Sequence, residues 1–218
     1  MILKGYLVGI TGRRRELLEN FCSEHGDSCY SEVLDVTQIS DLENRLERLI
    51  DKLGGLDILI ISSGTGDINE YLDFSIEHTT IETNVTGFTY VASWVFNFFQ
   101  KQNHGHLVTI SSVGGLRGSR QSPAYNASKA WQINYIEGLR QKAFHCGNTI
   151  HITDIRPGLI NTAMAKGEGL FWVMPVEKAC RQMLRAIEKK RRIVYVTRRW
   201  GLIARILKRI PGCIYSRM

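Results

Sequence analysis

Short apolar runs alternate with longer helical patterns along this 218-residue chain, and this alternation limits its fold more than any other feature. Six runs read as strands, and they cover residues 6–11, 28–34, 56–62, 106–111, 149–155 and 191–197. Helical patterns lie between them, including residues 41–52, 84–100, 125–144 and 176–190. Regular alternation of this kind favours an α/β domain with a parallel sheet covered by helices.

Bulk composition narrows the class of protein further. The chain is long enough for one domain with a substantial core, and no linker or internal repeat divides it. Five cysteines without a C-x-x-C pair indicate free thiols in a reducing compartment, so we expect a cytoplasmic protein. The sequence shows no signal peptide, no apolar run of membrane-spanning length and no metal-ligand spacing. We expect His104 and His106 to be solvated loop residues rather than ligands.

The net charge of +7 is concentrated at the C-terminus. Residues 178–218 carry thirteen basic residues and one acidic residue (net +12), whereas residues 1–177 carry fifteen basic and twenty acidic residues (net −5). No base-stacking platform accompanies the charge, so we expect no nucleic-acid partner. We divide the chain into a domain at residues 1–197 and a basic amphipathic tail at 198–218. Residues 199–210 are typical of a helix at an anionic inner membrane surface, but a helix packed on a partner subunit or over a binding site fits equally.

Three polar residues in the middle of the chain point to proton transfer. Tyr125 and Lys129 are four positions apart, so a helix places them on one face, one turn from each other. A free tyrosine has a pKa of about 10, and an ammonium group beside it favours the phenolate and lowers that pKa toward the working range. Ser112, at the end of a predicted strand, can polarise a substrate carbonyl. Together these residues predict a site at which a tyrosine exchanges a proton with a substrate.

The chain resembles the short-chain dehydrogenase/reductase family in the spacing of Ser112, Tyr125 and Lys129, and in the segment Ala-Ser-Lys that ends at Lys129. The resemblance covers residues 6–197 and includes four more motifs in the family's order: Asp35-Val36-Thr37, Ser62-Ser63-Gly64, Asn84-Val85-Thr86-Gly87, and Pro157-Gly158 followed by Thr162. It implies a doubly wound, Rossmann-like parallel sheet. Each motif also has a structural reading: Asp35 as a turn residue, Asn84 as a helix cap and Pro157-Gly158 as a turn that ends a strand.

The resemblance implies a role for each matching residue. Tyr125 would be the general acid/base, and Lys129 would lower its pKa and hold the nicotinamide ribose. Ser112 would bond to the substrate oxygen, and Asn84 would anchor a water relay through the lysine. Further cofactor contacts are implied for Asp35, Val36, Ser63, Gly64, Pro157, Gly158 and Thr162. Ser63 departs from the family, which usually has Asn-Ala-Gly at this place.

Two readings of the N-terminal part compete. The family's first strand leads into a Thr-Gly-x-x-x-Gly-x-Gly turn, whereas Thr11-Gly12-Arg13-Arg14-Arg15 supplies one glycine. If residues 6–11 are a degenerate first strand, Asp35 is the ribose-binding acid and the enzyme uses NAD. If they are the second strand, the first strand and glycine loop are missing, and Arg13 and Arg14 lie where basic side chains meet the 2′-phosphate of NADP. We prefer the second reading, because it explains six strands rather than seven and leaves Asp35-Val36-Thr37 at the end of the third strand.

The preferred reading has a consequence for the sheet. In the family's strand order, 3-2-1-4-5-6-7, the missing strand would lie between the strands at residues 6–11 and 56–62. We expect either two unpaired inner edges or direct pairing of those strands across the gap. We also expect weak cofactor binding by a 218-residue product, and an in-frame coding segment upstream of Met1 that encodes the missing strand.

These features favour an NADP(H)-dependent oxidoreductase that interconverts a carbonyl and an alcohol. The substrate would lie over residues 113–116 and under residues 163–175, where Leu170, Phe171, Trp172 and Met174 suit an apolar substrate. The apolar surface of residues 84–100, together with the resemblance, implies a homodimer or homotetramer. The alternative is a truncated or catalytically silent scaffold of the same fold that acts by association.

Overall fold

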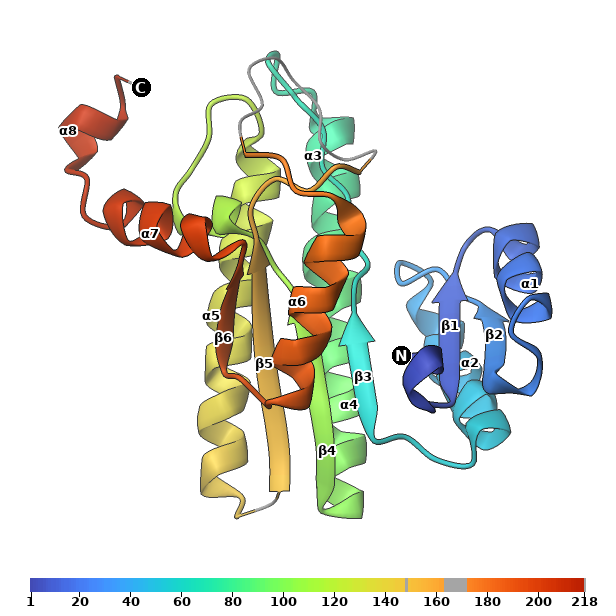
Figure 1. Ribbon diagram of the computed structural model, residues 1–218. Helices are drawn as coiled ribbons and strands as arrows, with labels where there is room; N and C mark the ends of the chain where they lie inside the picture. Colours follow the sequence, from blue (N-terminus) through green and yellow to red (C-terminus); the bar gives the residue numbers. More distant parts are fainter. Residues whose placement is uncertain (148, 163–171, 218) are drawn as a thin grey trace.

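A computed structural model describes residues 1–147, 149–162 and 172–217. Six strands alternate with helices, and every strand pair is parallel (Figure 1). The strands are β1 (Val8–Gly12), β2 (Cys29–Val33), β3 (Ile58–Ile61), β4 (His104–Ile110), β5 (Thr149–Pro157) and β6 (Ile193–Val196). The predicted α/β class with a Rossmann-like parallel sheet is therefore confirmed, with strand boundaries shifted by one to two residues in most cases.

The helices are α1 (Arg15–Ser23), α2 (Ile39–Leu53), α3 (Phe74–Ile81), α4 (Phe88–Gln102), α5 (Pro123–His145), α6 (Val176–Glu188), α7 (Arg198–Leu207) and α8 (Gly212–Tyr215). Short 3-10 turns occur at η1 (Ile2–Lys4), η2 (Gly26–Ser28) and η4 (Val113–Leu116). Local signals explain several ends. Gly54 ends α2 in a left-handed conformation, the Asp73 side chain caps α3 by accepting from the Ser75 amide, and Pro123 opens α5.

The strands form two separate sheets rather than one. One sheet has the order β1-β2 and the other has the order β3-β4-β5-β6. No ladder joins β1 to β3 among the described residues, although the two units lie side by side (Figure 1). β1 contains no fully buried residue and β3 contains only Ile61, whereas five residues of β4 are buried. Of the two arrangements expected from the sequence, the one with two unpaired inner edges is therefore the one observed.

Side chains hold the two units together where the backbone does not. Leu42 and Leu46 of α2 belong to the same buried cluster as Phe96 of α4 and Ile136 of α5, on one face of the sheets. On the opposite face, α6 covers β5 and β6 through a second cluster that includes Ala179 and Val196. The result is a three-layer α/β/α arrangement, with helices on both sides of the strands (Figure 1).

One glycine is required where the units meet. A Cβ atom added to Gly87 would lie 2.5 Å from the backbone oxygen of Val36, closer than real Cβ atoms approach. Val36 follows β2 in the N-terminal unit, and Gly87 belongs to the helical segment before α4. The two sequence motifs therefore contact each other directly, and only a residue without a side chain permits this approach.

The structure corrects two expectations about local environment. His104 and His106 belong to β4, and His106 is buried and hydrogen-bonded to the Thr153 hydroxyl at 2.8 Å, so it is not a solvated loop residue. Asn84 does not cap the start of a helix. It lies in a π-helical turn, η3 (Glu82–Gly87), that joins α3 to α4 in one continuous helical segment.

The C-terminal segment folds back onto the body of the chain. Trp200 and Ala204 of α7 are buried, and the Arg117 guanidinium donates to the Ile210 carbonyl at 3.1 Å and stacks over Tyr215 at 4.3 Å. Leu202, Ile206 and Ile214 remain more than half exposed. No helix in the described part of the chain combines the length and the apolar character needed to cross a membrane. The division at residue 197 stays a prediction.

Candidate active site

The carboxyl ends of β3, β4 and β5 bring the candidate site residues to one edge of the sheet, the usual ligand side of an open α/β sheet. Gly64 follows β3, Ser112 follows β4 and Gly158 follows β5. Tyr125 and Lys129 are placed above β4 by α5, which packs against η4 directly after Ser112. Gly64 and Lys129, sixty-five positions apart in the sequence, thus lie next to each other.

The Ser112 hydroxyl lies close enough to Tyr125 to affect the pKa of its phenol. Gly114 lies between them, since a Cβ atom there would be 3.3 Å from the Ser112 oxygen and 3.5 Å from the Tyr125 ring. Burial raises the pKa of Tyr125, and the nearby Ser112 hydroxyl opposes that effect. The lowering of this pKa by Lys129 stays a prediction; here its ammonium group donates to the Ile110 carbonyl and to Gln132.

Lys129 is buried, with 4% of its surface exposed. Its ammonium group lies 5.9 Å from the centre of the Tyr125 ring and donates to the Ile110 carbonyl at 3.2 Å. Burial lowers the pKa of Lys129 from 10.5 to about 8, and the buried Asp154 carboxylate on β5 opposes this decrease. The amine is therefore mostly charged at neutral pH but titrates within reach of physiological conditions.

Asn84 organises the loop after β3. Its side chain accepts a hydrogen bond from the Thr65 amide at 2.9 Å and donates to the Thr65 carbonyl at 2.7 Å and to the Ser128 hydroxyl at 3.0 Å. Ser128 in turn donates to the Tyr125 carbonyl at 2.8 Å. Asn84 is fully buried, so these bonds link η3, the loop and α5 into one polar network.

Two small residues let that loop lie against the site. A Cβ atom on Gly64 would be 3.3 Å from the Lys129 nitrogen, and one on Gly66 would be 2.3 Å from the Tyr125 ring. Ser63 precedes this close contact and is partly buried. The sequence motif identified Gly64 but not Gly66, whose only signal is a second glycine two positions later.

Gln132 is a site residue that the sequence motifs did not identify. Its side chain is buried and bonds both to the Lys129 ammonium group and to the Asn84 carbonyl. The sequence feature that could have identified it is a polar residue three positions after Lys129, on a helix face whose neighbouring residues are buried.

The N-terminal candidates lie around the end of β1. Arg14 is the N-cap of α1, and the guanidinium group of Arg13 lies 4.0 Å from the Asp35 carboxylate. Asp35 also accepts from the amide and hydroxyl of Thr37, and Val36 packs against the main core. Asp35, which binds the ribose in the first reading, and Arg13, which meets the 2′-phosphate in the second, therefore lie beside each other. The Arg13 side chain is exposed, and that of Asp35 is partly exposed.

These residues fit the two ends of a dinucleotide better than its middle. The polar groups near Arg13 suit a ribose or its phosphate, and Tyr125 and Lys129 suit a nicotinamide ribose. The turn after β1 has one glycine, Gly12, where a Cβ atom would meet nothing closer than 3.7 Å. Arginine side chains, rather than a glycine cradle, are what this turn offers to a phosphate.

The segment after β5 is only partly described. The Trp200 ring covers Gly158, because a Cβ atom there would lie 2.2 Å from the indole, and the Gly158 amide donates to the Val196 carbonyl. Thr162 is exposed. Leu170 and Phe171 lie outside the described residues. Met174 is buried in the second core cluster, and the Arg199 guanidinium lies over the half-exposed Trp172 ring at 5.7 Å.

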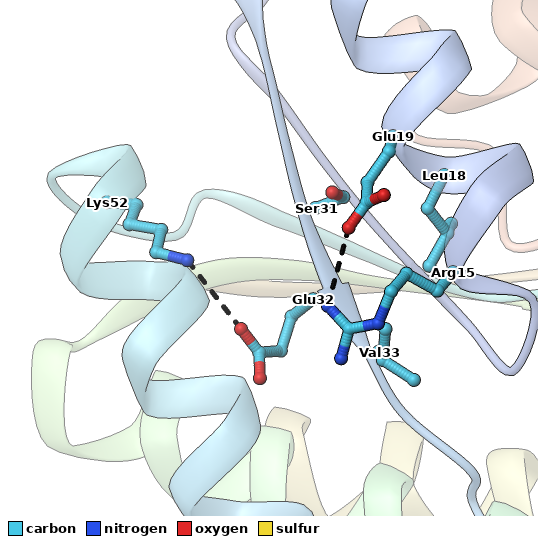
Figure 2. A pocket seen from close by; sticks show the side chains of 7 residues that line it. All are labelled: Arg15, Leu18, Glu19, Ser31, Glu32, Val33 and Lys52. Carbon is cyan, nitrogen blue, oxygen red and sulfur yellow. Dashed lines mark hydrogen bonds and ion pairs between the residues drawn. The ribbon is translucent and has the colours of Figure 1, made fainter.

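Hollows on the described surface include one near the N-terminal unit and one near the loop after η4. One, of about 250 Å³, lies between α1, β2 and the end of α2, and Figure 2 shows the residues that line it. Its charges are paired, with Arg15 bonded to Glu19 at 3.3 Å and Lys52 to Glu32 at 3.6 Å. The second hollow, of about 750 Å³, is lined by residues 117–121 with Tyr215 and Ser216. It borders the loop between η4 and α5 and is the nearer of the two in sequence to Ser112 and Tyr125.

Comparison with known proteins gives consistent similarities. Residues 1–170 match the family model described as short chain dehydrogenase. An NADP-dependent 3-hydroxy acid dehydrogenase, YdfG, of Shigella flexneri is 33% identical over 162 residues, which cover 73% of this chain and 64% of that protein. An uncharacterized oxidoreductase of Staphylococcus epidermidis, SERP2049, is 26% identical over 166 residues, covering 75% of this chain and 71% of the relative.

Solved structures agree with this grouping. The crystal structure of serine dehydrogenase from Escherichia coli superposes with a TM-score of 0.67 at 32% identity, covering 72% of this chain and 74% of that one. ElxO with NADP bound superposes with a TM-score of 0.76 over 89% of this chain and 88% of that chain. At 22% identity, the likeness to ElxO supports the fold alone.

Proposed function

Because the chain belongs to the short-chain dehydrogenase family of oxidoreductases, which act on CH–OH and C=O groups, we propose that it interconverts a carbonyl and an alcohol with NADP(H). The observation that carries the proposal is the convergence of Ser112, Tyr125 and Lys129 at one edge of the sheet. Two neighbouring hydroxyl groups beside a buried amine are suited to proton transfer at a carbonyl oxygen.

The roles follow from the chemistry of each side chain. In the reductive direction, the Tyr125 hydroxyl donates its proton to the substrate oxygen, which the Ser112 hydroxyl also holds by a hydrogen bond. The Lys129 ammonium group stabilises the phenolate that remains. A bound nicotinamide supplies the hydride. Asn84 keeps the loop at Thr65 in place, so that Gly64 and Gly66 can lie close to the reacting groups.

Replacing Tyr125 with Phe tests this assignment. We expect carbonyl reduction to fall by roughly 10²–10⁴-fold, because the variant lacks the proton donor while its ring keeps the same packing. Tyr135→Phe is the matched control, because it removes a hydroxyl from a partly buried tyrosine on the same helix, away from Ser112. Unchanged activity in Tyr125→Phe, with the circular dichroism spectrum and native mass retained, would remove Tyr125 from the mechanism.

The preference for NADP(H) rests on Arg13 and Arg14. Arginines at the start of α1 oppose the helix dipole, and a bound phosphate would relieve that conflict. We expect NADPH to bind more tightly than NADH, and Arg13→Ala with Arg14→Ala to lose roughly 1.5–3 kcal/mol of affinity for NADPH per charge-assisted bond. Arg15→Ala is the control, since Arg15 is paired with Glu19. Equal affinity for the two cofactors would favour Asp35 as the ribose-binding residue.

The divided sheet favours a second candidate function. A scaffold of this fold that lacks turnover and acts by association would tolerate the unpaired edges of β1 and β3, whereas a dinucleotide needs a backbone cradle near them. We expect the 218-residue chain to bind NADPH weakly. Isothermal titration calorimetry measures this, and tight binding together with turnover would eliminate the scaffold.

The remaining proposals concern assembly and substrate. Aromatic residues of α5 lie beside α4 at the surface, where Trp131 stacks on Tyr135 and donates to the Thr89 hydroxyl while staying half exposed. We infer that this face forms the interface of a homodimer or homotetramer, and that Trp131→Glu gives a monomer in sedimentation analysis. An apolar substrate under residues 163–175 is the corresponding proposal for specificity.

A further inference from the structure

Gln132 lies in the interior of the site with almost no contact with solvent. Its exposed fraction is 1%, and it is one turn further along α5 than Lys129, on the same face. The Lys129 nitrogen donates to the Gln132 side-chain oxygen at 3.0 Å, and the Gln132 side-chain nitrogen donates to the Asn84 carbonyl at 2.9 Å. One amide therefore connects the amine of α5 to the backbone of η3.

The chemistry of the two partners fixes the orientation of this amide. An ammonium group only donates hydrogen bonds, and a backbone carbonyl only accepts them. The glutamine oxygen must therefore face Lys129 and its nitrogen must face Asn84. Methionine has a similar length but makes neither bond, and asparagine is one methylene group shorter. Among neutral side chains of this length, only glutamine joins both partners.

The bridge also restricts the direction of the ammonium group. Lys129 has three N–H donors; one meets the Ile110 carbonyl and another meets Gln132. The same nitrogen faces Gly64, where an added Cβ atom would come within 3.3 Å. Ile110 and Gln132 thus hold the amine from two sides and leave its open side toward the loop that also touches Tyr125.

We propose that Gln132 is a positioning residue, which anchors the Lys129 ammonium group to the Asn84 carbonyl and directs its free N–H toward the Tyr125 side of the site. The inference rests on the proposed function where it assigns Lys129 to proton chemistry. The anchoring itself is a property of the folded chain and is measurable without turnover. Gln132 acts only through Lys129 and contacts no reacting atom in this arrangement.

Anchoring predicts a change in the pKa of Lys129. A neutral acceptor that bonds to the ammonium form favours that form, so its loss should lower the pKa. The titratable groups that face Lys129 are Asp154 on β5, which raises its pKa, and Tyr125 on its own helix. Because a Gln132 variant keeps both, the difference between variant and wild type reports the amide alone.

The experiment is a titration of Lys129 by nuclear magnetic resonance in protein labelled at the lysine side chains, with no nicotinamide added. We expect the pKa in Gln132→Met to fall by about one unit, a tenfold change in the proton affinity of the amine. The Lys129 signal is identified by its loss in Lys129→Met. Ile136→Ala is the matched control, because Ile136 is equally buried one turn further along α5 and makes no polar bridge.

A conservative variant protects the test against loss of folding. In Gln132→Glu, a protonated carboxyl keeps both hydrogen bonds and an ionised one adds an opposite charge, so the pKa of Lys129 should be at least as high as in wild type. If Gln132→Met does not fold, Gln132→Glu decides the question alone: a clearly lower pKa overturns the proposal. An unchanged pKa in Gln132→Met, or an equal decrease in Ile136→Ala, also overturns it.

Activity gives an independent readout. The ammonium form is the active one, so reductive activity is lost as pH rises through the Lys129 pKa. The alkaline limb of the pH profile should therefore move to lower pH in Gln132→Met by the same interval as the titration. If the chain reduces no carbonyl, the proposed function fails while the titration still decides the role of Gln132.

Discussion

Replacing Lys129 with Met should change how the stability of the protein depends on pH. Burial lowers the pKa of Lys129 from 10.5 in its ordinary state to about 8. A folded pKa below the unfolded value means that the unfolded chain binds more protons between these two values. Burial of Lys129 therefore costs no unfolding free energy above pH 10.5, where the amine is neutral in both states. The cost appears as pH falls below 10.5 and is complete below pH 8.

The size of the effect follows from the two pKa values. Carrying the charged amine into the interior costs roughly 3 kcal/mol at pH 7, and roughly 1 kcal/mol at pH 10. The contribution of Lys129 should therefore rise by roughly 2 kcal/mol across this range. At pH 7 the variant also leaves the Ile110 carbonyl and the Gln132 oxygen without their donor, at roughly 1–3 kcal/mol each. These costs do not vary with pH, so the slope is the cleaner signal.

Urea denaturation at pH 7, 8, 9 and 10, followed by circular dichroism, measures this slope. We expect the free energy of unfolding of wild type, minus that of Lys129→Met, to increase by roughly 2 kcal/mol over the series. Lys142→Met removes an exposed lysine from the same helix and controls for the general effect of lost positive charge. Parallel curves for wild type and Lys129→Met would refute the reasoning, since they would mean that Lys129 is not buried as an ammonium group.

Four further predictions concern other parts of the molecule. Burial lowers the pKa of His106 from 6.5 to about 4, so wild type should lose about 2 kcal/mol of unfolding free energy between pH 7 and pH 5, and His106→Asn should lose less over the same interval. Gly87→Ala should destabilise the chain by roughly 1–3 kcal/mol in urea, because its methyl group would meet the Val36 carbonyl; no change would mean that the two units separate freely. Arg117→Ala should speed trypsin cleavage within residues 205–209, since that side chain holds the C-terminal segment, and equal cleavage rates would count against this anchor. Flotation with anionic liposomes tests membrane contact of residues 199–210, which stays a prediction; we expect any binding to require the exposed apolar face of α7.

The class of fold and the main residues of the site could be predicted from the amino-acid sequence. Strand and helix patterns depend on periodicities of two and 3.6 residues, which are local and can be read without coordinates. The four-residue spacing of Tyr125 and Lys129 likewise places them on one helix face in any α-helix. The single glycine after β1 and the count of six strands also predicted a missing central strand, but they left open whether the sheet would be interrupted or would close across the gap.

The pairing of the buried polar groups depends on packing in three dimensions and could not be predicted from the sequence. Gln132 and Asn84 are forty-eight positions apart, and their hydrogen bond depends on how α5 packs against the π-helical turn η3. The environment of His106 was misjudged for the same reason, because its burial depends on Thr153 and β5 and not on the neighbouring glycine. The direction of the Lys129 pKa shift follows from burial and long-range partners too. Local pattern identifies which side chains are present, whereas packing across the sheet sets the charge and hydrogen bonding of each one.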